Sequence, residues 1–147
     1  MVQLEIKMPI FIARQYFKST VGFSRNEESR RSITDDPEFY VPAILKTKGQ
    51  ENTDFLIDDM IMHYEKDLKF YNKLLKNKVA PEQARIVLPQ AMYTTFIETG
   101  SLAAYARLYK LRIKKDAQWE IQEYAKAIDK ACLEVAPISW AALKRTV

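Results

Sequence analysis

In the stretch VQLEIKMPIFIARQYFK, residues 2–18, the spacing of apolar residues changes from that of a strand to that of a helix. Apolar and polar residues alternate from Val2 to Lys7, which is typical of a half-buried β-strand. Pro9 suits the first turn of a helix, and IFIARQYF extends that helix to about residue 18. The sequence therefore predicts a strand that leads directly into a short helix.

Most of the remaining chain has apolar residues three and four positions apart, the spacing of amphipathic helices. Ser101 is a good N-cap for one of these segments, and Pro81 and Pro89 are placed to begin and end another. Helices are expected over residues 54–77, 81–87, 102–114, 116–135 and 138–145.

A second strand is predicted over residues 92–97, because that segment is rich in β-branched and aromatic residues. Residues 19–32 are polar and basic and include Gly22, which predicts a loop. We therefore expect an α+β fold, a helix-rich single domain over residues 1–147 with one small antiparallel sheet.

Composition excludes several classes of protein. The three glycines cannot form the glycine-rich phosphate loop of a Rossmann or P-loop protein. His63, the only histidine, cannot belong to a multi-histidine metal cluster, and we expect it on the surface or satisfied in the core. Cys132 is the only cysteine and lies on an apolar helix face, so a core residue is favoured over a nucleophile.

Cysteine content and hydropathy predict a small cytoplasmic protein. A lone cysteine suits a reducing compartment, and no apolar run approaches the ~18 residues of a transmembrane helix. The net charge of +4 fits an anionic small molecule at least as well as nucleic acid.

The first candidate site is a basic cluster between residues 14 and 31. Arg30 and Arg31 beside Ser29 offer forked guanidinium donors and a hydroxyl, which suit a phosphate dianion. Glu27 could accept a hydrogen bond from a ribose hydroxyl or an imide nitrogen. A solvated loop is the alternative that composition leaves open. The cluster consists of Arg14, Lys18, Arg25, Arg30 and Arg31, mixed with Asn26, Glu27 and Ser29.

Three further arginines are candidates. Arg85 lies in the otherwise apolar segment ARIVLP, where an arginine is rarely buried without a partner, so either a ligand or a carboxylate is expected. Arg107 and Arg112 are five positions apart on one helix and point about 140° apart. Exposed helix charges are the alternative for this pair.

These segments resemble the flavin-dependent thymidylate synthases. In that family a strand leads into a helix reading P-x-F-x-x-R-Q, followed by R-H-R and N-E-x-S-x-R. Further blocks follow here in the family's order, and together they cover nearly all of the chain. The matching blocks are PIFIARQYFK (9–18), NEESRR (26–31), EFYVP (38–42), ARIVLP (84–89), TGSL (99–102), KLR (110–112) and AQWEIQ (117–122).

The resemblance implies roles for the candidate residues. It implies that dUMP is bound by Gln15, Lys18, Glu27, Ser29, Arg30, Arg31, Arg85 and Arg112, with Gln15 and Arg112 on the uracil side. It implies that FAD is bound by Lys18, Asn26, Glu27, Ser101 and Arg107. Arg112 is the expected catalytic residue, which polarises a uracil carbonyl.

The resemblance also implies the reaction and the assembly. dUMP is converted to dTMP with FAD as cofactor, and with methylenetetrahydrofolate and NADPH as co-substrates. No protein nucleophile is required, which agrees with the interpretation of Cys132. Family members form homotetramers with shared active sites, and we expect the same assembly here.

The chain departs from the family pattern in three places. Lys18, Ser19 and Thr20 stand in place of R-H-R, and eight residues rather than seven separate Thr20 from Ser29. Asp116 stands where many members have a histidine. The family's segment before the first strand, with its histidine-containing loop, is expected to be missing.

Two alternatives to an active enzyme therefore stay open. One is a catalytically impaired or fragmentary nucleotide-binding homologue. The other is a small basic protein that binds nucleic acid through residues 18–31, although the chain contains no recognisable nucleic-acid motif.

Overall fold

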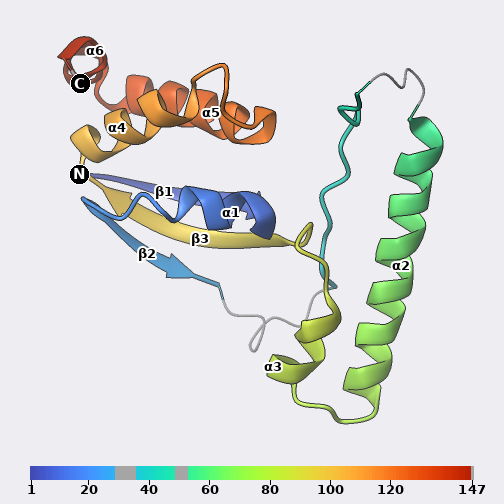
Figure 1. Cartoon of the computed structure of the whole chain (residues 1–147). Coiled ribbons are helices and arrows are strands. Elements are labelled where there is room, and N and C mark those ends of the chain that lie inside the picture. The colour runs from blue at the N-terminus through green and yellow to red at the C-terminus, as the bar shows by residue number, and fades with distance from the viewer. Residues whose placement is uncertain (29–35, 49–52, 147) are drawn as a thin grey trace. The chain divides into compact units, whose positions relative to one another are not determined.

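A computed structural model describes residues 1–28, 36–48 and 53–146 of the chain (Figure 1). Its strands are β1 (Val2–Pro9), β2 (Phe23–Glu27) and β3 (Tyr93–Gly100). Its helices are α1 (Ile10–Tyr16), α2 (Asp54–Lys76), α3 (Pro81–Ala84), the 3-10 helix η1 (Arg85–Val87), α4 (Leu102–Arg112), α5 (Trp119–Val135) and α6 (Pro137–Thr146). The helix-rich α+β prediction is confirmed.

The chain divides into two compact units. The first contains Met1–Met8, Ile12–Glu27 and Thr95–Val147, and the second contains Pro9–Phe11 and Glu28–Thr94. The single domain expected from the sequence stays a prediction, and each unit is described by itself below.

The three strands form one sheet in the order β1-β3-β2 (Figure 1). β2 runs antiparallel to β3, with Phe23 opposite Gly100 and Glu27 opposite Phe96. A Cβ at Gly100 would lie 2.6 Å from a Phe23 ring carbon, so only glycine allows this ring to pack over β3. The small antiparallel sheet is therefore confirmed.

The predicted loop over residues 19–32 is wrong for residues 23–27, which form β2. The strand escaped prediction because it is a short edge strand whose outward residues are polar. Its inward residues still pack, since the Phe23 ring lies edge-on to the Tyr105 ring with centroids 5.0 Å apart. Residues 29–32 lie outside the described residues.

The core of the first unit lies between the sheet and the C-terminal helices. Helices α4, α5 and α6 pack against one another (Figure 1). Trp140 of α6 is fully buried. The Trp140 indole donates to Asp129 over 2.6 Å, and Lys144 donates to the same oxygen over 2.7 Å. On α5 the expected stripe is buried at Ile121, Ile128 and Cys132 and half-buried at Tyr124, whereas Val135, predicted to continue it, is 63% exposed.

The second unit contains α2 and the short helices α3 and η1, which contact it. The predicted helix over residues 54–77 is confirmed, but Tyr71 is its only buried residue. The Phe39 and Tyr64 rings lie 5.2 Å apart and provide one of its contacts. His63 is exposed, as the surface interpretation expected. None of the helices in the described ranges is long and apolar enough to cross a membrane.

The buried thiol of Cys132 gives the fold a testable pH dependence. Burial, aided by the charge of Asp129, raises the pKa of Cys132 to about 11. An unfolded thiol has a pKa of about 8.5, so the folded state holds this proton more tightly. The thiol's contribution to stability should be complete below about pH 8.5 and should be lost as the pH rises towards 11.

Urea unfolding of the native protein and of Cys132→Ala between pH 7 and pH 11 measures this contribution. The difference between the two free energies of unfolding should shrink above about pH 8.5. Iodoacetamide at pH 8 should alkylate Cys132 only in denaturant. Rapid alkylation of the folded protein would show a reactive thiol instead.

Candidate functional site

The candidate site lies in the first unit, around residues 15–21, where α1 ends and the chain turns towards β2. Three arginines from other elements donate hydrogen bonds to backbone carbonyls of this segment. Arg112 Nη2 lies 2.7 Å from the Gln15 oxygen, Arg25 Nη2 lies 2.6 Å from the Ser19 oxygen, and Arg107 Nη2 lies 3.0 Å from the Val21 oxygen. We call residues 15–21 the arginine-held segment.

Two polar atoms, one at the start of this segment and one on α4, have no hydrogen-bond partner among the described residues. Gln15 Oε1 and Arg112 Nε are buried, and neither hydrogen-bonds to any described residue. A buried polar group without a partner is costly, and such groups in folded proteins call for an explanation. A ligand that offers one donor and one acceptor would satisfy both atoms.

Arg112 is a half-buried side chain, and burial lowers the pKa of its guanidinium because the charged form loses hydration. A charged donor in such a poorly solvated place interacts strongly with a carbonyl oxygen. The alternative of an exposed helix charge is therefore wrong for Arg112. Arg107 is exposed, although its guanidinium also holds the backbone.

The start of α4 approaches the end of the arginine-held segment closely. Ser101 Oγ accepts from the Ala104 amide over 3.1 Å, which confirms the predicted N-cap. The Ser101 amide donates to the Gly22 carbonyl over 3.1 Å. Gly22 has a φ of +83°, and a Cβ there would lie 2.9 Å from the Ala104 Cβ. Glycine is therefore required for both the turn and the close approach.

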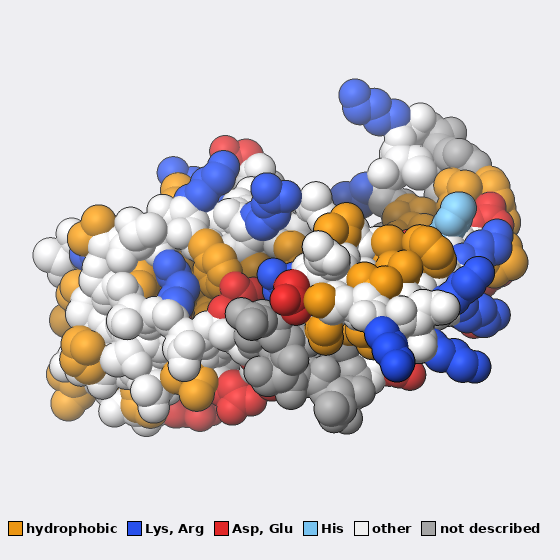
Figure 2. Space-filling model, turned by 90° about the horizontal axis from the view of Figure 1, so that it is seen from below, with side chains coloured by type: hydrophobic (Ala, Val, Ile, Leu, Met, Phe, Trp, Pro, Cys, Tyr) orange, Lys and Arg blue, Asp and Glu red, His pale blue; other side chains and the backbone are white. Residues whose placement is uncertain are grey.

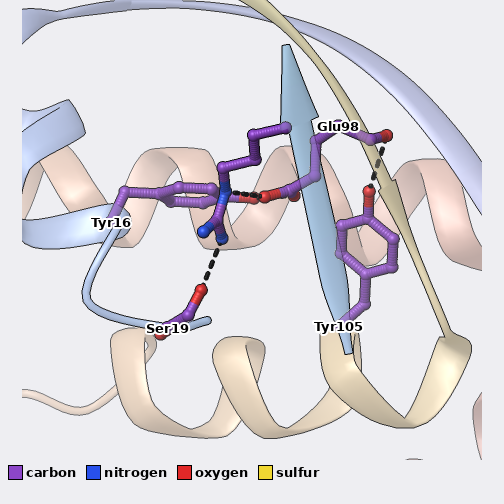
Figure 3. A network of polar contacts seen from close by, with 5 residues as sticks. Tyr16, Ser19, Glu98 and Tyr105 are labelled. Atoms are coloured by element: carbon purple, nitrogen blue, oxygen red, sulfur yellow. Dashed lines mark hydrogen bonds and ion pairs between the residues drawn. The ribbon is translucent and has the colours of Figure 1, made fainter. Parts of the chain in front are cut away.

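A buried carboxylate is connected to this segment through Tyr16 and Arg25 (Figure 3). Glu98 of β3 is 0% exposed, and its Oε1 accepts from the Tyr16 hydroxyl over 2.6 Å. Its Oε2 pairs with Arg25 Nε at 2.5 Å. The Tyr105 hydroxyl donates to the Glu98 backbone oxygen over 3.3 Å. Burial, together with the nearby Glu98 charge, raises the pKa of both Tyr16 and Tyr105, so both phenols remain donors.

Sequence reasoning missed this network. Arg25 was grouped with cations that could meet a phosphate, but the structure directs its guanidinium to Glu98 and to a backbone carbonyl. A signal was present, because Thr94, Phe96 and Glu98 alternate onto the buried face of β3. An acidic residue on a buried face is almost always paired.

The remaining candidates of the first unit are exposed. Lys18 lies two residues after the end of α1, and Asn26 and Glu27 end β2 opposite Ile97 and Phe96. Asp116 is also exposed, in the turn between α4 and α5. The first unit therefore contains seven of the predicted site residues: Gln15, Lys18, Asn26, Glu27, Ser101, Arg107 and Arg112.

The predicted phosphate ligands belong elsewhere. Arg85 is exposed at the start of η1 in the second unit, and it forms no ion pair within the described ranges. The structure therefore does not provide the carboxylate partner that was the alternative for Arg85. Ser29, Arg30 and Arg31 lie outside the described residues.

Comparison with known proteins identifies the family. The profile of the Thy1 family, thymidylate synthase complementing protein, matches residues 1–138. A flavin-dependent thymidylate synthase of Thermus thermophilus is 34% identical over 151 residues, which cover 97% of this chain and 56% of that protein. One from Thermosipho melanesiensis is 37% identical over 144 residues, covering 90% of this chain and 62% of that protein.

A solved structure shows the same fold. The UMP/dUMP methylase PolB from Streptomyces cacaoi, bound with 5-Br dUMP, superposes with a TM-score of 0.84 at 26% identity, covering 97% of this chain and 70% of that chain. The chain thus belongs to the thymidylate synthase complementing protein family. It spans 56% of the Thermus protein and 62% of the Thermosipho protein, less than two thirds of either.

Proposed function

We propose that this chain methylates dUMP to dTMP as a flavin-dependent thymidylate synthase. The observation that carries the proposal is that Gln15 Oε1 and Arg112 Nε are buried and have no hydrogen-bond partner in the part of the chain that the structure describes. The names of the relatives support the reaction, and a dUMP analogue bound to the similar methylase PolB supports the substrate.

The two atoms match the edge of a uracil ring. Gln15 Oε1 can accept only, and Arg112 Nε can donate only. The imide N3–H of uracil and one of its carbonyl oxygens are the complementary donor and acceptor. The Arg112 guanidinium would also stabilise negative charge that develops on the carbonyl oxygen while C5 reacts.

The cofactor we propose is FAD, with methylenetetrahydrofolate as the one-carbon donor and NADPH as the reductant. The exposed amide of Asn26, the carboxylate of Glu27 and the guanidinium of Arg107 are groups that suit flavin hydroxyls and phosphates. Ser101 Oγ accepts from the backbone and keeps its own hydroxyl hydrogen to donate. When bound there, FAD would supply the hydride that completes the methyl group.

The uracil assignment predicts selectivity that calorimetry can measure. Arg112→Lys should weaken dUMP binding by about 1.5–3 kcal/mol, the range for hydrogen bonds to charged groups, and Gln15→Ala should weaken it by about 0.5–1.5 kcal/mol, the range for neutral groups. dCMP should bind the native protein poorly, because its N3 is an acceptor and would face Gln15 Oε1. Arg145→Lys on α6 is the matched control, since Arg145 is exposed and forms no part of the site.

Equal affinities of native protein for dUMP and dCMP would remove the imide assignment. So would unchanged dUMP affinity in both site variants while Arg145→Lys behaves like the native protein.

The dUMP phosphate is proposed to bind Arg85 together with Ser29, Arg30 and Arg31. Forked guanidiniums and a hydroxyl suit a dianion, and Arg85 is exposed in the described structure. Arg85→Ala should weaken dUMP binding by about 1.5–3 kcal/mol. Deoxyuridine lacks the phosphate, so its affinity should be the same in native protein and variant.

The control for this titration is Lys66→Ala, which removes another exposed cation of the second unit. An equal loss of deoxyuridine affinity in Arg85→Ala would show that Arg85 does not act on the phosphate.

We further propose a homotetramer with shared active sites. Helix α2 carries several exposed apolar side chains: Phe55, Ile61, Met62 and Phe70 are 54%, 38%, 50% and 49% exposed. Hydrophobic and basic side chains lie next to one another on this part of the surface (Figure 2). Exposed apolar patches of this kind often mark interfaces between proteins.

Light scattering should therefore find a particle of about four times 17.2 kDa. Phe70→Asp should reduce its mass, because a carboxylate would be buried in an apolar interface. Lys69→Gln changes the net charge by the same amount on the adjacent exposed position and should leave the mass unchanged. A monodisperse, folded monomer of the native chain would contradict the shared-site assembly.

A further inference from the structure

We propose that the buried Arg25–Glu98 pair is a positioning device that holds the turn at residues 18–21, and that it thereby sets the affinity of the ligands bound there. The inference rests on the proposed function, because Lys18 in this turn is assigned to both dUMP and FAD. Arg25 is here a positioning residue, since it acts through the backbone at Ser19.

The guanidinium of Arg25 connects the sheet to the turn. Its Nε lies 2.5 Å from Glu98 Oε2, and its Nη2 lies 2.6 Å from the Ser19 carbonyl oxygen (Figure 3). The guanidinium is planar, so fixing one nitrogen on Glu98 also fixes the direction of the other. The Arg25 side chain is only 14% exposed, which keeps water from competing for these bonds.

Glu98 is also held in place by contacts other than the one with Arg25. The two residues are directly opposite each other in the antiparallel register of β2 and β3. The carboxylate is fully buried, and the Tyr16 hydroxyl donates to its other oxygen over 2.6 Å. Tyr16 ends α1, two residues before Lys18, so this bond also ties the start of the turn to the sheet.

Aromatic rings restrict Arg25 further. The central carbon of its guanidinium lies 4.8 Å from the centroid of the Phe23 ring, 5.2 Å from that of Phe17 and 5.3 Å from that of Tyr16. A cation at such distances from an aromatic face is attracted to it. Contacts on this many sides favour the single conformation that reaches the Ser19 carbonyl.

Stability alone does not require this arrangement. Replacing a buried ion pair with apolar residues of similar volume is often neutral or stabilising. An apolar side chain at position 25 could fill the space between the rings, but it could not hold the Ser19 carbonyl. The property that only the ion pair provides is the position of the turn.

The test separates positioning from folding. The triple variant Tyr16→Phe, Arg25→Met, Glu98→Leu replaces all three partners with apolar groups and leaves no buried charge unpaired. Thermal unfolding should give a midpoint equal to or above that of the native protein. Calorimetry should nevertheless find dUMP or FAD binding weakened tenfold or more.

A second readout needs no ligand. The Ser19 amide donates to the Tyr16 carbonyl over 3.1 Å, and the Phe23 amide donates to the Thr20 carbonyl over 3.2 Å. The Ser19 amide lies in the turn and the Phe23 amide bonds to a carbonyl of the turn, so both report on its order. Hydrogen exchange at both should be faster in the triple variant than in the native protein, while exchange in α5 stays unchanged.

Arg25→Lys is the conservative comparison and serves in place of the triple variant if that does not fold. A lysine can pair with Glu98, but a single ammonium cannot reproduce the two directed bonds of the guanidinium. It should keep a near-native melting temperature and still lose affinity. Tyr16→Phe alone keeps the Arg25–Glu98 pair and should retain most of the binding.

Native exchange at Ser19 and Phe23 in the folded triple variant would overturn the proposal, as would native affinity for both dUMP and FAD in folded Arg25→Lys and triple variants. If the native protein itself bound neither ligand, the proposed function would fail. The exchange rates would still decide whether the pair positions the turn.

Discussion

The structure of the first unit depends on a buried carboxylate that must have hydrogen-bond and charge partners. An unpaired charge at the fully buried Glu98 would cost several kcal/mol, so the fold has to bring partners to it. Each partner comes from a different element: Arg25 from β2, Tyr16 from the end of α1 and, at the backbone oxygen, Tyr105 from α4. Satisfying one residue therefore joins an edge strand and two helices to the centre of the sheet.

The candidate site also depends on hydrogen bonds between elements. The arginine-held segment is anchored by side chains donating to its carbonyls at Gln15, Ser19 and Val21, rather than by a strand ladder. Side-chain anchors leave the rest of the segment free to face a ligand. Gln15 Oε1 and Arg112 Nε are buried without partners within the described ranges, and binding of the proposed substrate would relieve this state.

What could be predicted from the sequence was local. Apolar spacing gave α2 and α5, and the hydroxyl of Ser101 gave the N-cap of α4, because these features depend on neighbours within a few residues. β2 was missed because a short, polar edge strand has its stabilising partners in β3. The Arg25–Glu98 pair joins positions 73 residues apart, and Arg112 meets Gln15 across 97 residues. A local sequence pattern cannot reveal contacts between residues so far apart along the chain. The candidate residues divide in the same way. Arg112 was a candidate from its own sequence and Gln15 from the family resemblance, but only the packed structure shows that a polar atom of each is buried without a partner among the described residues.

The electrostatics of the site follow from the pairing of Arg25 with Glu98. Glu98 neutralises Arg25, so Arg25 contributes direction to the turn and little net charge to a ligand. The described cations that can still attract an anion near the arginine-held segment include Arg14, Lys18, Arg107 and Arg112. Of these, Arg112 is half-buried, and an interaction with it loses less to solvent than one with an exposed cation. The strongest electrostatic contact should therefore fall at the proposed uracil end of the segment, where the proposed chemistry needs it. The exposed Lys18 would supply a weaker, salt-sensitive attraction for phosphate.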